Sequence, residues 1–104
     1  MTKNDLMQAY YIDREIQSWT EEEKKLKDDK QKIKIKKKIS ELQGKRQEII
    51  DFIMGIDDPQ TRLIVKLRCY NLLTWNAVAD KIGGMNSEDT VKKRFYRFLK
   101  KAGA

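Results

Sequence analysis

The sequence predicts an all-α protein in two parts: an N-terminal helical arm over residues 1–55 and a three-helix, helix-turn-helix unit over residues 56–104. Apolar side chains recur at three-, four- and seven-residue spacings along most of the chain, which is the period of amphipathic helices. The single proline and a pair of glycines fall between these segments, where they end helices. Hydrophobic residues make up 39% of the chain and charged residues 38%, as is typical of a small helical protein.

The arm begins with an apolar series that predicts one helix over residues 3–27. Part of this series repeats every seven residues, the spacing of a coiled-coil seam: Ile12, Trp19, Leu26 and Ile33. A second seven-residue series then follows, offset from the first by two positions: Ile35, Leu42, Ile49 and Ile56. A single straight seam does not tolerate that offset easily.

The break between the two series falls in a polar stretch, and we therefore predict a helical hairpin. Its turn is expected near residues 28–31, and its second helix is expected to continue to Met54 before Gly55 ends it. Gly44 lies inside that helix and weakens it. The alternative is one long bent helix that pairs with a second chain.

A run of nine lysines extends from Lys24 to Lys38 around the predicted turn. Such a run is either a second nucleic-acid contact or a solvated helix surface. No arginine or aromatic residue stands among these lysines to grip phosphates or stack on bases. This absence favours the solvated surface.

The C-terminal part contains three amphipathic segments between Arg62 and Lys101. Asp57-Asp58-Pro59 cap and open the first, whose apolar side is expected to hold Leu63, Ile64, Leu67 and Tyr70. Thr74 is a good N-cap for the second, which ends at Gly83-Gly84. Its apolar side chains follow helical spacing: Trp75, Val78, Ala79 and Ile82.

The third segment is the most basic part of the chain. It opens at Asn86-Ser87 and has one apolar stripe: Val91, Phe95, Phe98 and Leu99. Its other faces carry cations, with no acid after Asp89: Lys92, Lys93, Arg94, Arg97, Lys100 and Lys101. Residues 56–104 hold 10 basic and 5 acidic side chains, whereas residues 1–55 hold 13 and 11, so most of the net charge of +7 lies in the C-terminal part.

A three-helix unit with a capped, cationic last helix is what a helix-turn-helix DNA reader requires. In that motif the middle helix crosses the DNA backbone, and the start of the last helix enters the major groove. The alternative is a three-helix bundle whose basic face is only solvated.

The order Arg-Leu-Ile-Val…Leu-Arg-Cys-Tyr, Leu-Thr-Trp-Asn-Ala-Val-Ala-Asp-Lys-Ile-Gly and Thr-Val-Lys-Lys-Arg-Phe…Phe-Leu resembles region four of bacterial sigma factors. It is more similar still to the sigma-like phage regulators of the RinA and ArpU late-gene activator type. The resemblance covers roughly residues 57–101 and implies a helix-turn-helix that binds promoter DNA. One difference is that the turn at residues 83–87 is longer than the Gly-x-Ser turn of most sigma-like members.

The expected base-facing residues occupy the first two turns of the last helix: Ser87, Glu88, Asp89, Thr90, Lys92, Lys93 and Arg94. Thr90, Lys93 and Arg94 lie away from the apolar stripe or at its margin, and we expect them to contact the groove. An acid in this position either accepts a hydrogen bond from cytosine or caps backbone amides. The expected phosphate contacts are Arg97, Lys100 and Lys101, with Arg62, Lys66, Thr74 and Asn76 from the earlier helices.

The residue types present do not predict an enzyme. The chain has no histidine, no glycine-rich phosphate loop and no paired carboxylates in an apolar setting, so no catalytic residue, metal or cofactor is expected. Its one cysteine, Cys69, is expected to be a small core side chain. The sequence shows no signal peptide and no apolar run that predicts a membrane span, and we expect a cytoplasmic protein.

One isolated helix-turn-helix reads only a few base pairs, so a specific regulator needs a second copy or a partner. The expected partners are double-stranded DNA, a second copy joined through the N-terminal helices as a homodimer, and bacterial RNA polymerase. Two other functions remain open: a small terminase-like DNA-packaging protein, and a protein-interaction module that binds polymerase without DNA.

Overall fold

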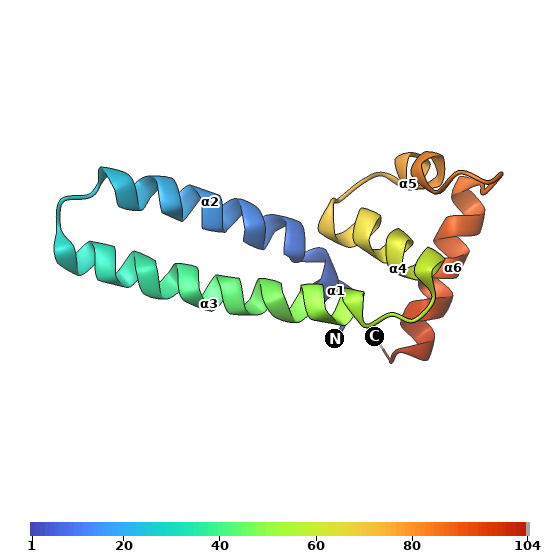
Figure 1. Cartoon of the computed structure of the whole chain (residues 1–104), viewed down its shortest axis with the longest axis horizontal. Helices are drawn as coiled ribbons and strands as arrows, with labels where there is room; N and C mark the ends of the chain where they lie inside the picture. The colour runs from blue at the N-terminus through green and yellow to red at the C-terminus, as the bar shows by residue number, and fades with distance from the viewer. Residues whose placement is uncertain (104) are drawn as a thin grey trace.

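A computed structural model describes residues 1–103 and shows helices joined by short loops, with no strand among these residues (Figure 1). The all-α prediction is confirmed. In chain order the elements are α1 (Lys3–Met7), α2 (Ala9–Lys25), α3 (Asp29–Met54), α4 (Pro59–Val65), the π-helical η1 (Lys66–Tyr70), α5 (Trp75–Ile82) and α6 (Glu88–Lys101).

The arm is a helical hairpin, in which α2 and α3 lie side by side and extend to one end of a molecule 54 Å long (Figure 1). The chain turns at residues 26–28, slightly earlier than the predicted 28–31, because Asp28 caps α3 by accepting a hydrogen bond from the amide of Lys30 at 2.9 Å. The predicted single helix over residues 3–27 is divided at Gln8, which separates α1 from α2.

The hairpin seam follows the second predicted series more closely than the first. Its buried side chains are Ile12 and Ile16 from α2 and Leu42, Ile49 and Ile53 from α3. The prediction that Ile33 continues the first seam is wrong, because this side chain is 67% exposed. Since the chain has already turned, Ile33 belongs to α3. The side of α3 that faces α2 is instead set by Leu42 and Ile49, and Ile33 points to solvent.

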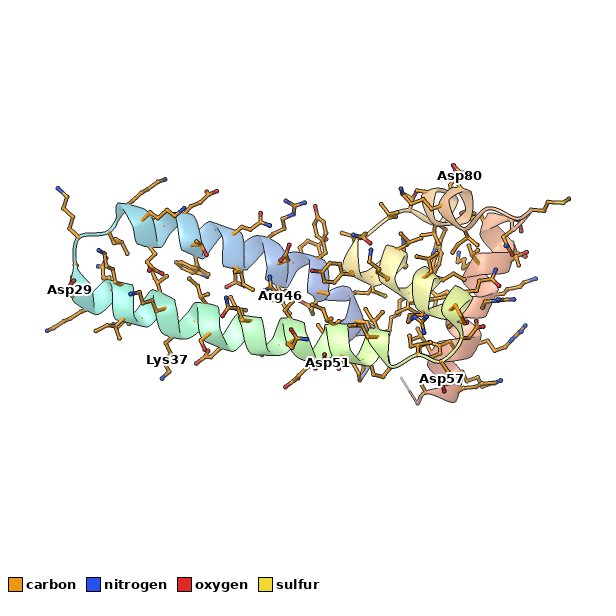
Figure 2. The ribbon with its side chains drawn as sticks, in the orientation of Figure 1. Asp29, Lys37, Arg46, Asp51, Asp57 and Asp80 are labelled. Carbon is orange, nitrogen blue, oxygen red and sulfur yellow. The ribbon has the colours of Figure 1, made fainter. Side chains whose placement is uncertain are left out.

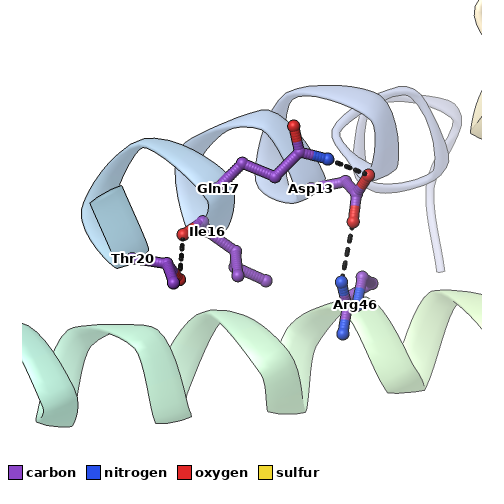
Figure 3. A network of polar contacts seen from close by, with 5 residues as sticks. All are labelled: Asp13, Ile16, Gln17, Thr20 and Arg46. Carbon is purple, nitrogen blue, oxygen red and sulfur yellow. Dashed lines mark hydrogen bonds and ion pairs between the residues drawn. The ribbon is translucent and has the colours of Figure 1, made fainter. Parts of the chain in front are cut away.

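The shorter of the two ion pairs between the helices of the hairpin joins Asp13 to Arg46. Figure 2 shows the Arg46 side chain between α2 and α3, whereas Lys37 points away from both. The Arg46 guanidinium donates to the Asp13 carboxylate at 2.7 Å, and Gln17 donates to the same carboxylate at 3.3 Å (Figure 3). The pair therefore helps to fix the register of α2 on α3.

The helix made by α4 and η1 is the central element of the C-terminal part. It contacts α1 and α2 of the arm through η1, and it contacts α5 and α6 through α4. Ile64, Val65 and Cys69 are fully buried between these neighbours. The prediction that Leu63 shares the apolar side is wrong, because Leu63 is 41% exposed. Since neighbours enclose this helix on two sides, its buried positions do not form the single stripe that the sequence pattern indicated.

Side-chain caps fix the start of each helix in this part. Asp58 caps α4, Thr74 caps α5 by accepting from the amide of Ala77 at 3.2 Å, and Ser87 caps α6 by accepting from the amide of Thr90 at 3.1 Å. Between α5 and α6, Gly83, Gly84 and Met85 have φ values of 67°, 61° and 65°. This left-handed stretch reverses the chain so that α6 packs across α4 and α5.

A single apolar core joins the arm to the C-terminal part. It extends from Leu6 of α1, through the hairpin base and η1, to Phe95 and Leu99 of α6. Trp75 lies at its edge, with its ring centroid 5.1 Å from that of Phe95. The base of the arm is therefore part of the scaffold that holds α6 in place.

Candidate nucleic-acid interface

Helix α6 presents its basic side chains on the face opposite its buried stripe. Val91, Phe95 and Leu99 are buried against α4 and α5, and Phe98 is half-buried. The predicted interface residues on the solvent side of α6 and at its cap are all exposed: Ser87, Glu88, Asp89, Thr90, Lys92, Lys93, Arg97, Lys100 and Lys101. The structure thus brings nine of the predicted residues together on one surface.

The first turn of α6 is held by its own hydrogen bonds. The Ser87 hydroxyl accepts from the amide of Thr90 at 3.1 Å and lies 2.9 Å from the Thr90 hydroxyl. Lys93 forms an exposed ion pair with Asp89, four residues earlier, at 3.0 Å. Because both partners are about 70% exposed, this pair contributes little stability and separates readily. Lys93 is therefore free to exchange Asp89 for a phosphate or a base edge.

Arg94 does not extend into solvent like its neighbours. It is half-buried, its guanidinium donates to the side-chain oxygen of Gln60, and it lies 3.9 Å from the Asp58 carboxylate. Asp58 also accepts from the hydroxyl and amide of Thr61, at 2.7 and 2.9 Å. These two bonds, with the nearby positive charge of Arg94, lower the pKa of Asp58. The structure thus places Arg94 as a link between α6 and the start of α4, although it was expected in the groove.

Three of the exposed cations on α6 have no acidic partner among residues 1–103: Arg97, Lys100 and Lys101. Lys92 is likewise exposed and outside any ion pair within those residues. Cations that are not already paired with carboxylates can neutralise phosphates without first breaking an internal contact. These four side chains are thus available for polyanion binding.

The start of α5 lies next to this surface. Thr74 and Asn76 are exposed, and Trp75 between them packs into the core. The guanidinium of Arg68 lies 4.6 Å from the Trp75 ring centroid and donates to the carbonyl of Leu73 at 2.9 Å. This contact fixes the loop that leads into α5, so the first turn of α5 is held next to α6.

Two residues that the sequence pattern did not single out also lie at this surface. The ammonium of Lys3 in α1 donates to the hydroxyl of Tyr96 at 3.1 Å. Tyr96 is 41% exposed, and its ring lies 6.3 Å from that of Trp75. Helical spacing alone places Tyr96 off the buried stripe, but no local signal connects two residues that stand 93 positions apart.

An open groove of about 970 Å³ lies on the other side of α6, between its C-terminal half and the end of α3. Its apolar lining comes from Phe52, Ile56 and Phe98. Acidic and basic side chains also line the groove: Asp51, Asp57, Asp58, Arg94, Arg97 and Lys101. Arg97 and Lys101 therefore border both the groove and the exposed basic face of α6.

The one cysteine lies in the core and not at the candidate interface. Cys69 is fully buried, and burial raises the pKa of its thiol to about 12, so it stays protonated at neutral pH. No group of three or more potential metal ligands occurs in the described part of the chain. None of its helices is both long and apolar enough to cross a bilayer.

Comparisons of the chain with protein-family models, with curated proteins and with solved structures find no match. The function is therefore inferred from the residues and their arrangement.

Proposed function

We propose that this chain is a sequence-specific DNA-binding transcription regulator of the phage or prophage type, in which α6 reads the major groove. The observation that carries the proposal is the division of α6 into two faces. One face is buried in the core through Val91, Phe95 and Leu99. The other is exposed and carries cations that mostly have no ion-pair partner within residues 1–103. A helix held in this way can enter a groove without losing the order of its backbone.

The roles of the residues follow from their position along α6. Thr90 and Lys93, in the first two turns, are the best placed to reach base edges. Arg97, Lys100 and Lys101 are placed to hold phosphates, with Thr74 and Asn76 of α5 on the adjoining backbone. Arg94 acts through α4 and orients α6, since its guanidinium is already engaged by Gln60.

One copy of this unit covers a short site, so the proposal includes a partner for the hairpin arm. In a homodimer two hairpins would pair and set the spacing of two half-sites. In a sigma-like activator the arm would contact bacterial RNA polymerase instead. Both arrangements leave the exposed face of α6 available to DNA.

The test is a fluorescence-anisotropy titration of the full chain against two duplexes of equal length. One duplex comes from the neighbourhood of the gene, and the other has unrelated sequence. We expect tighter binding to the local duplex and an affinity that falls steeply with salt, because each phosphate contact releases counterions. Equal affinity for both duplexes would contradict a sequence-specific regulator, and the absence of binding at low salt would contradict DNA binding altogether.

Matched charge reversals locate the surface. The double variant Lys93→Glu/Arg97→Glu is expected to abolish salt-dependent binding. The control is Lys34→Glu/Lys37→Glu, which makes the same change in net charge on the hairpin. If both variants lose affinity equally, total charge rather than α6 determines binding.

The groove beside α6 favours a second candidate, in which the unit binds a protein. Its apolar lining from Phe52 and Phe98 could take apolar side chains of a partner, and its charged rims could pair with acids and bases on that partner. Phe98→Ser is the variant that separates the two candidates if α6 remains folded. DNA affinity would then survive, whereas binding of polymerase or another protein would be lost.

A further inference from the structure

The first residue of α1, Lys3, lies against α6 and carries a charge that no acid among residues 1–103 neutralises. The Lys3 ammonium is held by Tyr96, with the hydroxyl at 3.1 Å and the ring centroid at 5.1 Å. Asp5, the acid nearest to it in sequence, instead accepts from the amide of Thr2 at 2.9 Å. Lys3 forms no ion pair within residues 1–103. A neutral phenol thus fixes the position of this cation without cancelling its charge.

The Lys3–Tyr96 contact lies at the junction of the two DNA-facing helices. Along α6, Lys92 and Lys100 stand four residues before and after Tyr96, and both are exposed. On the other side, Tyr96 packs near Trp75, the first residue of α5 after the Thr74 cap. The start of the middle helix is where a helix-turn-helix approaches the DNA backbone. Lys3 therefore lies beside the DNA backbone that α5 is expected to cross.

We propose that Lys3 and Tyr96 form a phosphate-binding site for duplex DNA, so that the N-terminal helix α1 belongs to the DNA interface. This inference rests on the proposed function, and it adds a contact outside the helix-turn-helix itself. The Tyr96 hydroxyl accepts from Lys3 and keeps its own proton, which it donates to a phosphate oxygen. The ammonium of Lys3 supplies the positive charge. Because the ring already orders the lysine chain, little side-chain freedom is lost on binding.

The test compares Lys3→Met with Lys30→Met, an equal loss of charge at the far end of the hairpin. Duplex affinity of the full chain is measured between 50 and 200 mM salt. We expect Lys3→Met to reduce the slope of log affinity against log salt by about 0.9, the value for one phosphate contact, so that its affinity falls roughly 3.5-fold less than the wild-type affinity over this range. Lys30→Met is expected to leave the slope unchanged, and Lys3→Arg is expected to restore it.

Tyr96→Phe separates the phosphate contact from simple support of the fold. It keeps the ring under Lys3 and removes only the hydroxyl, so we expect affinity to fall about 2- to 10-fold with the slope nearly unchanged. Circular dichroism melts of each variant verify that it is folded at the assay temperature.

Three results would overturn the inference. If the wild type binds DNA with a steep salt dependence and Lys3→Met has the same slope, Lys3 does not contact phosphate and the proposed function still stands. If Lys3→Met and Lys30→Met flatten the slope equally, the effect comes from net charge alone. If the wild type shows no salt-dependent binding, the proposed function and this inference fail together.

Discussion

The hairpin tip and helix α6 are both rich in lysine, yet they present their charge in different ways. The tip carries nine lysines from Lys24 to Lys38 on two helices and their turn, with Asp28 and Asp29 among them and Lys36 lying 3.9 Å from Glu23. On α6 no acid follows Asp89, and all its cations except Arg94 are exposed on the solvent side of a single helix. At the tip the lysines are thus spread over two helices and mixed with acids, whereas on α6 they lie along one helix.

The two regions also differ in how firmly the charged helix is held. Helix α6 is anchored by Phe95, which is fully buried and packs on Trp75. In the outer part of the hairpin α2 and α3 pack only on each other, and the Ile33 side chain there is largely exposed. Recognition of a groove requires side chains in fixed positions, whereas solubility requires only charge. The comparison favours α6 as the reading element and the tip as a solvated surface.

The largest expected effect comes from removing the anchor of α6. Phe95→Ala should lower the free energy of unfolding by about 3–5 kcal/mol, because it leaves a cavity where the ring was fully enclosed. Ile33→Ala in the hairpin should change it by less than about 0.5 kcal/mol, since that side chain is already in water. Urea unfolding followed by circular dichroism measures both values. Similar losses in the two variants would mean that the tip is covered in solution, for example by a second copy.

Most helix positions could be predicted from the sequence, because caps and breakers act locally. Thr74, Ser87 and Asp58 cap the helices that they were expected to begin. The all-α class and the hairpin also follow from local spacing. The errors at Leu63 and Ile33 have a different origin: burial depends on which elements pack on a helix, and spacing does not state how many faces will be covered.

The candidate interface could be predicted only in part for the same reason. Exposed cations on α6 follow from its amphipathic pattern, and nine residues of the predicted set lie on one surface. The engagement of Arg94 by Gln60 and the contact of Lys3 with Tyr96 depend on packing between segments 34 and 93 residues apart. Charge and spacing along one helix contain no information about either contact.

Alanine substitutions at two glycines, one before α6 and one in the hairpin, are expected to change the stability of the protein in opposite directions. Gly83, between α5 and α6, has φ 67° and ψ −154°, a region that is open almost only to glycine. Gly83→Ala should therefore destabilise the protein by about 1–3 kcal/mol and weaken DNA binding through misplacement of α6. Gly44 lies inside α3, and no atom beyond its chain neighbours and the surrounding helix backbone lies within 4 Å of an added Cβ. Gly44→Ala should stabilise the protein by about 1 kcal/mol and leave DNA affinity unchanged.

Urea denaturation of the two variants measures the change in the free energy of unfolding of each. Fluorescence anisotropy measures the affinity of each variant for DNA. A Gly44→Ala variant that is less stable than the wild type would show that the open side of α3 is covered in solution by something that an added methyl group disturbs.

The smallest expected effect distinguishes the two parts by their acid sensitivity. Hydrogen bonds from the Thr61 hydroxyl and amide lower the pKa of Asp58 at the start of α4, and bonds from the Thr2 amide and hydroxyl lower that of Asp5 in the arm. A lowered folded-state pKa contributes stability that is full above the unfolded value near 3.8 and is lost as the pH falls through the folded value. Asp58→Asn and Asp5→Asn should each make stability less dependent on pH below about 4, with little change in the pH dependence of stability near neutral pH.

Because Asp58 also approaches Arg94 in the middle of α6, only Asp58→Asn should weaken DNA binding at neutral pH, which anisotropy measures. Equal weakening by Asp5→Asn would instead indicate that the capping box of α1 orients Lys3 at the interface, and would join the arm to the DNA-binding surface from its first turn.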